Sequence, residues 1–165
     1  RIGYRLGAPV QSRRVAPPAM PELGFQLGDP VPGRDQWRLT RKLDVSLSSE
    51  VWLSEHIKTG DRRVFKFAAD GVRLQALKRE VTLARFLQES LGGRPTFVRV
   101  LEWNFEQAPF YIESEYGGVD LNEWAESQGG LSAIPFAVRL RVLIDVARAL
   151  ASAHEIGVLH KDLKP

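Results

Sequence analysis

A change of hydrophobic period between the first and second thirds of the chain constrains its fold most strongly. Apolar and polar residues broadly alternate in three segments, residues 37–43, 51–57 and 63–67. This period predicts strands with one buried face, and residues 58–61 form a turn between the last two. From Leu74 the apolar spacing becomes three and four and ends before Gly92, which predicts a helix. We therefore expect a three-stranded antiparallel meander followed by one helix.

Further strands and helices are predicted downstream. Strands are expected at residues 97–103 and 110–116, and a short helix near residues 121–124. A long helix over residues 136–156 has Ser132 as a candidate cap and Pro135 in its first turn. Its apolar row predicts that most of this helix is buried. The order indicates an α+β fold, with a five-stranded antiparallel sheet, one helix beside it and further helices after it.

Composition excludes several classes of function. The 165 residues suit one ordinary domain, and a net charge of +3 is too small to argue for nucleic-acid binding. The absence of cysteine excludes disulfides, thiolate zinc sites and cysteine nucleophiles, and we expect a cytoplasmic location. No apolar run approaches the ~20 residues of a membrane span. Because the sequence begins with Arg1 and without a signal peptide, we expect an excerpt of a longer protein.

A strand lysine and a helix glutamate form the first candidate site. Lys66 projects to the face opposite Phe65 and Phe67. Glu80 has only apolar neighbours three and four positions away, so its carboxylate is expected on the buried side of the helix. Because an unpaired buried charge is unfavourable, we expect Lys66 and Glu80 to pair. Taken alone, such a pair is more simply interpreted as structural.

The end of the chain carries the most specific motif. It reads His160, Lys161, Asp162, Leu163, Lys164, Pro165. Alone, this hexapeptide is equally consistent with a charged tail. With Lys66 and Glu80 upstream in the right order, it favours phosphoryl transfer. From about Trp37 to its end, the chain resembles the eukaryotic-like Ser/Thr protein kinases of bacteria, over the small lobe and the first part of the large lobe.

The resemblance implies roles for the matching residues. Asp162 would be the catalytic base, Lys164 would steady the γ-phosphate, and His160 would brace the loop. Lys66 matches the lysine that holds the α- and β-phosphates, with Glu80 as its partner on the regulatory helix. ATP and Mg²⁺ are therefore the implied cofactors.

The resemblance also implies sites for adenine and ribose. The other implied cofactor-binding residues are Leu43, Val51, Val64, Glu115, Gly117 and Asp120. Leu43 and Val51 lie in the segment that matches the phosphate-covering loop, and Val64 would lie above adenine. Glu115 and Gly117 belong to the hinge that follows a gatekeeper, Ser114. Asp120 is expected to reach the ribose.

The departures from this family concern phosphate binding and regulation. Asp44, Ser46 and Ser49 occupy the three glycine positions of the phosphate-covering loop, which predicts weakened nucleotide affinity. Lys161 replaces an arginine that clamps a phosphorylated activation loop, so control by such phosphorylation is not expected. The magnesium ligands are expected beyond Pro165, and the excerpt alone is expected to be inactive.

The sequence thus predicts an ATP-dependent Ser/Thr protein kinase that acts on a protein hydroxyl. The alternative is a pseudokinase that serves as a binding or scaffold module, because all three loop glycines are lost. A small-molecule phosphotransferase is disfavoured, since residues 163–165 match the protein-kinase version of the loop.

The beginning of the chain suggests a second domain. Residues 1–6 resemble the closing hairpin of winged-helix output domains of bacterial transcription regulators, which implies DNA as a partner of the complete protein. Proline and glycine crowd residues 7–35, which predicts a linker. We expect residues 36–116 to form the kinase small lobe and hinge, and residues 117–165 to begin the large lobe.

Overall fold

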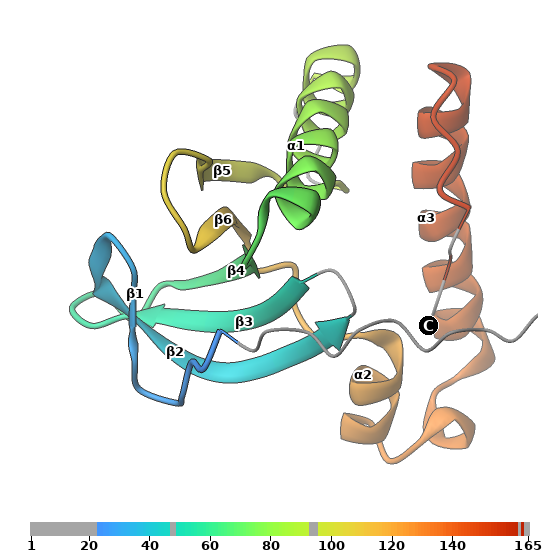
Figure 1. Ribbon diagram of the computed structural model, residues 1–165. Helices are drawn as coiled ribbons and strands as arrows, with labels where there is room; N and C mark the ends of the chain where they lie inside the picture. Colours follow the sequence, from blue (N-terminus) through green and yellow to red (C-terminus); the bar gives the residue numbers. More distant parts are fainter. Residues whose placement is uncertain (1–22, 47–48, 93–95, 162, 164–165) are drawn as a thin grey trace, which may run out of the picture.

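The computed structural model describes residues 23–46, 49–92, 96–161 and 163. It is an α+β fold, in which one antiparallel sheet carries helix α1 on one face and leads into α2 and α3 (Figure 1). The strands are β1 (Pro30–Val31), β2 (Arg34–Ser46), β3 (Ser49–His56), β4 (Arg62–Ala68), β5 (Val100–Asn104) and β6 (Phe110–Glu115). The helices are α1 (Gly71–Leu91), α2 (Leu121–Ser127), a 3-10 turn η1 (Leu131–Ala133) and α3 (Phe136–Glu155).

The predicted meander is confirmed as β2, β3 and β4. These strands are neighbours in a sheet of order β1-β2-β3-β4-β6-β5, and every pairing is antiparallel. The turn between β3 and β4 closes where the amide of Gly60 donates to the carbonyl of His56 at 2.9 Å. Gly60 has φ of +73°, a conformation that residues with a side chain rarely adopt.

The sheet has six strands rather than the predicted five. The additional strand, β1, contains Pro30 and lies at the sheet edge. An edge strand tolerates proline, because the residue's lack of an N–H does not break a hydrogen bond inside the sheet. Val31 is completely buried, and Leu23 and Phe25 pack against the same core. Residues 23–35 of the predicted linker therefore belong to the folded structure, because one buried and two partly buried apolar side chains pack there despite the many prolines and glycines.

Helix α1 covers the face of the sheet that we call the inner face. Leu77 and Val81 of α1 pack with Ala68 of β4 and Ile112 of β6 in one buried cluster. Asp70 caps the first turn by accepting from the amide of Arg73 at 2.9 Å. At the other end Gly92 takes the left-handed conformation, with φ of +68°, as the predicted stop signal requires.

Two predicted details downstream are wrong. Strand β5 begins at Val100 rather than at residue 97. Ser132 lies in η1 and does not cap α3, whose N-cap is Pro135 without a side-chain hydrogen bond.

Helix α3 is not mostly buried. Phe136 and Leu143 are 70% and 63% exposed, and Ala153 is its only buried residue among those described. Figure 1 shows α3 standing apart from the sheet, so no strand covers its apolar row. None of the described helices has both the length and the apolar character that crossing a bilayer requires.

Candidate active site

The inner face of the sheet brings three of the predicted nucleotide-binding residues together: Val51, Val64 and Lys66. One cross-strand row consists of Val51, Lys66 and Ile112, and the next consists of Leu53, Val64 and Ser114. Directly opposite residues of antiparallel strands project to the same face. Lys66 therefore lies beside Val51, one row from Val64, as the kinase resemblance requires.

The predicted ion pair between the strand lysine and the helix glutamate forms. Lys66 Nζ lies 2.6 Å from Glu80 Oε2, a short charge-assisted hydrogen bond. The glutamate is 47% exposed, so its predicted burial is wrong: Leu77 and Val81 occupy the buried stripe, and Glu80 lies at its edge. A pair this exposed contributes only about 0–1 kcal/mol to folding. Its main effect is to fix the position of the ammonium group.

The hairpin of β2 and β3 lies where the family has its glycine loop. Asp44 pairs with Val51, and the ladder continues to Ser46 and Ser49. The register shifts between Lys42 and Asp44, so Leu43 occupies an irregular position. The two strands therefore stay paired up to Ser46 and Ser49, with serine or aspartate at the family's three glycine positions.

The segment that precedes β5 is hydrogen-bonded to the predicted hinge. Arg99 Nε donates to Glu115 Oε1 at 2.9 Å, and the amide of Glu115 donates to the carbonyl of Arg99 at 3.0 Å. The hydrogen bond from Arg99 lowers the pKa of Glu115. A Cβ on Gly117 would lie 2.8 Å from Val98 Cγ2, so a larger residue here would require the Val98 side chain to move. The hinge and residues 98–99 are therefore joined as one unit by these hydrogen bonds and by this close approach.

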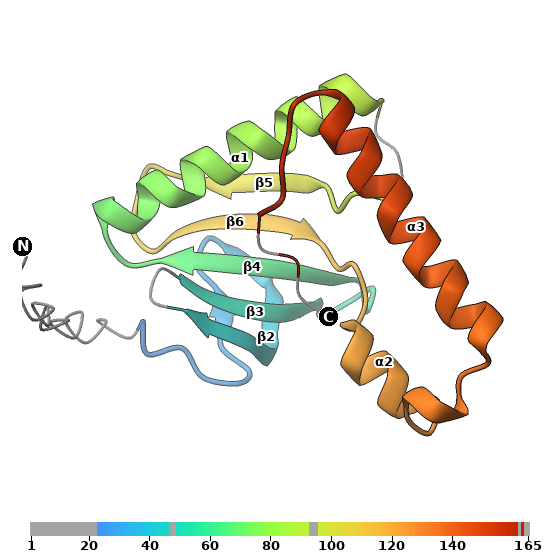
Figure 2. The ribbon, with the colours of Figure 1, turned by 90° about the vertical axis from the view of Figure 1, so that its right-hand side faces the viewer.

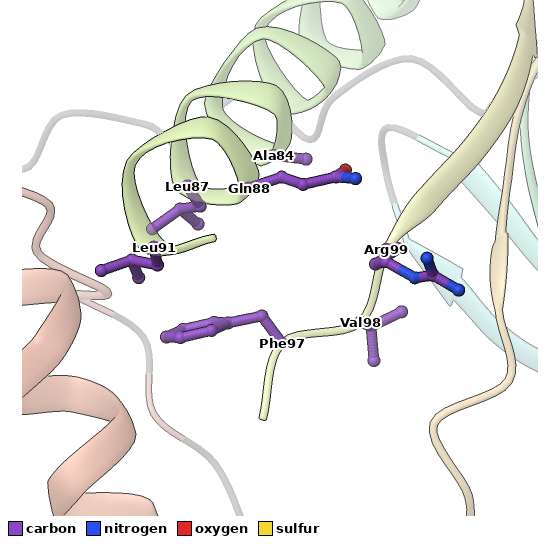
Figure 3. A pocket seen from close by; sticks show the side chains of 7 residues that line it. All are labelled: Ala84, Leu87, Gln88, Leu91, Phe97, Val98 and Arg99. Carbon is purple, nitrogen blue, oxygen red and sulfur yellow. The ribbon is translucent and has the colours of Figure 1, made fainter. Parts of the chain in front are cut away.

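A small cavity lies beyond this unit, at the end of α1 (Figure 3). Leu87, Leu91 and Phe97 line its apolar end, and Arg99 points away from them. Its volume of about 100 Å³ is below the roughly 300 Å³ of small-molecule sites. It does not accommodate a nucleotide and contains neither Lys66 nor a hinge residue.

Asp120 has a structural role in the fold. It caps α2, with its Oδ1 accepting from the amide of Glu123 at 2.8 Å. Glu123 in turn pairs with Arg41 of β2 at 2.9 Å, an exposed contact between the sheet and α2. One carboxylate oxygen of Asp120 is thus engaged by the helix, and its contact with a ribose hydroxyl stays a prediction.

The terminal motif is described only in part. The chain turns back after α3 (Figure 2), with Gly157 at φ of +80°. Lys161 has φ of +62° and is the only non-glycine residue with positive φ in the described ranges. This conformation costs of order 1–3 kcal/mol and is typical of functional loops. Asp162 and Lys164, and the winged-helix-like residues 1–6, lie outside the described residues.

The described part of the chain offers no ready metal site. Across residues 23–46, 49–92, 96–161 and 163, no group of three His, Asp or Glu side chains is arranged to hold a metal ion. That the magnesium ligands lie beyond Pro165 stays a prediction.

Sequence comparison supports the kinase resemblance at low identity. No protein-family model matches the chain. A probable serine/threonine-protein kinase of Clostridium perfringens is 31% identical over 110 residues, which cover 63% of this chain and 16% of that protein. The serine/threonine-protein kinase PrkC of Bacillus subtilis is 27% identical over 146 residues, covering 84% and 21%. The chain is kinase-like.

The chain matches only a small part of each relative. The tyrosine-protein kinase MasK of Myxococcus xanthus is 35% identical over 83 residues, which cover 44% of this chain and 13% of that protein. The chain thus spans about a fifth or less of the length of these three relatives. An α+β fold with a curled antiparallel sheet is compatible with a kinase small lobe.

Sequence reasoning missed two buried carboxylates on the outer face, opposite α1. Glu50 is 2% exposed and Glu113 is 3% exposed. The sequence contained a sign of their burial. Each glutamate lies two positions from a buried aromatic residue, Trp52 or Tyr111, and therefore on the same face of its strand. An acidic residue on the apolar face of a strand indicates a buried partner.

Proposed function

We propose that this chain forms the nucleotide-binding part of an ATP-dependent protein kinase that phosphorylates Ser or Thr hydroxyls of proteins. The observation that carries the proposal is the 2.6 Å contact between Lys66 and Glu80. Lys66 lies in the same cross-strand row as Val51. A chance arrangement of charges would not place this pair between a kinase-like hairpin and hinge in the kinase order.

Each described residue then has one task. Glu80 takes one of the three ammonium donors of Lys66, and the others are directed to the α- and β-phosphates of ATP. Leu43, Val51 and Val64 supply apolar contact for the adenine ring. The backbone of residues 115–117 hydrogen-bonds the adenine edge, and Asp120 accepts from the ribose.

The terminal motif supplies the chemistry. Asp162 orients the acceptor hydroxyl and takes its proton, and Lys164 neutralises charge on the transferred phosphoryl group. Mg²⁺ is the expected metal, and it would screen the phosphate charges when bound. Its ligands are not among the described residues.

Phosphate incorporation tests this proposal on the complete gene product. Radiolabelled ATP and a generic Ser/Thr substrate are compared for the native protein and Asp162→Asn, with Asp145→Asn on the exposed face of α3 as control. The proposal expects incorporation by the native and control proteins and a loss of about 100-fold or more in Asp162→Asn. Equal incorporation by all three contradicts it.

One observation favours the second candidate, a pseudokinase scaffold. Asp44, Ser46 and Ser49 replace the loop glycines, and Asp44 adds negative charge where phosphates would approach. A scaffold is expected to show no Asp162-dependent incorporation although it folds cooperatively. Titration with MgATP adds a second criterion. A protein that neither binds MgATP nor transfers its phosphate is not a kinase.

A further inference from the structure

Glu50 is a buried carboxylate whose role in the proposed site has not been assigned. Its Oε1 accepts from the amide of Leu23 at 3.2 Å. Its Oε2 accepts from Trp52 Nε1 at 3.1 Å and lies 3.2 Å from Lys42 Nζ. Burial acts to raise the pKa of Glu50, but the hydrogen bonds from Trp52, Leu23 and Lys42 outweigh it and lower the pKa.

The three partners of Glu50 come from three segments around one hairpin. Lys42 and Trp52 are cross-strand neighbours on β2 and β3, and each directly adjoins a residue predicted to contact nucleotide, Leu43 or Val51. The ammonium group of Lys42 also lies 5.4 Å from the centre of the Trp52 ring. Glu50 therefore ties together both strands of the phosphate-covering hairpin, one residue pair away from the last pair before its turn.

The third partner belongs to a segment, residues 23–34, that we call the strap. Phe25 of the strap packs on Phe67 of β4, with ring centres 4.6 Å apart. The far end of the strap is anchored by Arg34, whose guanidinium lies 2.7 Å from Glu113. The strap is thus held at both ends by buried carboxylates.

We propose that Glu50 is a positioning residue for ATP, and that the strap holds the phosphate-covering hairpin in place through it. This inference rests on the proposed function. A loop with three glycines adapts to phosphates by bending, whereas this paired hairpin must already be correctly placed. A buried charge is tolerated only with its partners in position, so Glu50 couples the hairpin to the strap.

Glu50→Gln tests the inference, with Glu113→Gln as the matched control. Glu113 is equally buried, but it lies on β6 and holds only the far end of the strap, at Arg34. The end that reaches Glu50 stays in place through the packing of Phe25 on Phe67. We expect Glu50→Gln to raise the KM for ATP about tenfold with little change in kcat, since a charge-assisted contact is lost. Glu113→Gln is expected to lower the Tm and leave the KM unchanged. An unchanged KM in Glu50→Gln, or equal increases in both, overturns the inference.

A second pair of variants isolates the strap. Leu23→Pro removes the amide that donates to Glu50, whereas Leu23→Ala shortens the side chain and keeps the amide. We expect Leu23→Pro to reproduce the KM increase and Leu23→Ala not to. A KM in Leu23→Pro no higher than in Leu23→Ala contradicts the role of the strap.

Amide hydrogen exchange separates this inference from the proposed function. It is measured without nucleotide across residues 43–52, in the native protein and in both glutamine variants. Faster exchange in Glu50→Gln alone supports positioning by Glu50, and identical exchange in all three overturns it. If the native protein binds no MgATP, the proposed function fails, while the exchange result still decides whether Glu50 orders the hairpin.

Discussion

The guanidinium of Arg34 lies 2.7 Å from the buried carboxylate of Glu113, which is 79 residues further along the chain. Burial raises the pKa of Glu113, and the charges of Arg34 and Arg63 partly offset that effect. Arg34 also reaches Glu102, on the neighbouring strand, at 3.3 Å. The beginning of β2 is therefore bound to the far edge of the sheet, and the strap that ends at Arg34 is part of the fold.

Truncating Val31 tests whether the strap is part of the core. Val31→Ala is expected to lower the free energy of unfolding by about 2 kcal/mol, because the side chain is completely buried. Leu27→Ala is the control, since Leu27 is 69% exposed, and it should stay within about 0.5 kcal/mol of the native value. Urea unfolding measures both. A linker would leave the two variants indistinguishable.

Removing the charge of Lys66 should affect activity far more than stability. Lys66→Met is expected to lower phosphate incorporation about 100-fold or more, because a preorganised cation at the phosphates is lost. The free energy of unfolding should change by less than about 1 kcal/mol, since the pair with Glu80 is partly exposed. Lys58→Met in the β3–β4 turn is the control. Retained incorporation in Lys66→Met would remove this lysine from the site.

Two glycine substitutions should have opposite effects on stability. Gly117→Ala is expected to cost about 0.5–1.5 kcal/mol, because the new Cβ meets Val98 Cγ2 at 2.8 Å and the half-exposed Val98 side chain must leave its rotamer. Gly71→Ala in the first turn of α1 meets nothing within 4 Å and should stabilise by about 0.4–1 kcal/mol. Thermal unfolding of both variants checks the signs. Equal or reversed effects contradict the close packing of the hinge.

Glu50 and Glu113 should make opposite contributions to stability as pH changes. The pKa of Glu50 is lowered from 4.5, so its contribution is present above that value and is lost as pH falls through the lowered pKa. The pKa of Glu113 is raised from 4.5, so the folded state binds the proton more tightly and stability falls as pH rises from 4.5 through the raised pKa.

Unfolding measured against pH with each glutamine variant checks these signs. The native protein should gain stability relative to Glu50→Gln as pH rises toward 4.5. It should lose stability relative to Glu113→Gln above pH 4.5. Parallel curves for either variant would contradict the pKa direction given for that residue.

Local sequence patterns were sufficient to predict most elements and the main ion pair. Alternation between Trp37 and Phe67 is visible along the chain, and it yields β2 to β4 because each strand needs one apolar face. The helical spacing before Gly92 likewise predicts α1. The pairing of Lys66 with Glu80 followed from two charges on otherwise apolar faces. Whether they bind phosphate stays a prediction.

The strap, the burial of Glu50 and the exposure of α3 were decided only by the tertiary structure. Proline and glycine counts describe local backbone preference, and they do not reveal that Leu23 and Val31 find a core on strands far along the chain. An apolar row indicates a surface that can be buried, and whether it is buried depends on what packs against it. The sequence by itself determined the strands and helices that show a clear hydrophobic period, and an ion pair between charges on two consecutive elements. The contacts between distant segments depend on strand register and loop path, which no local spacing encodes.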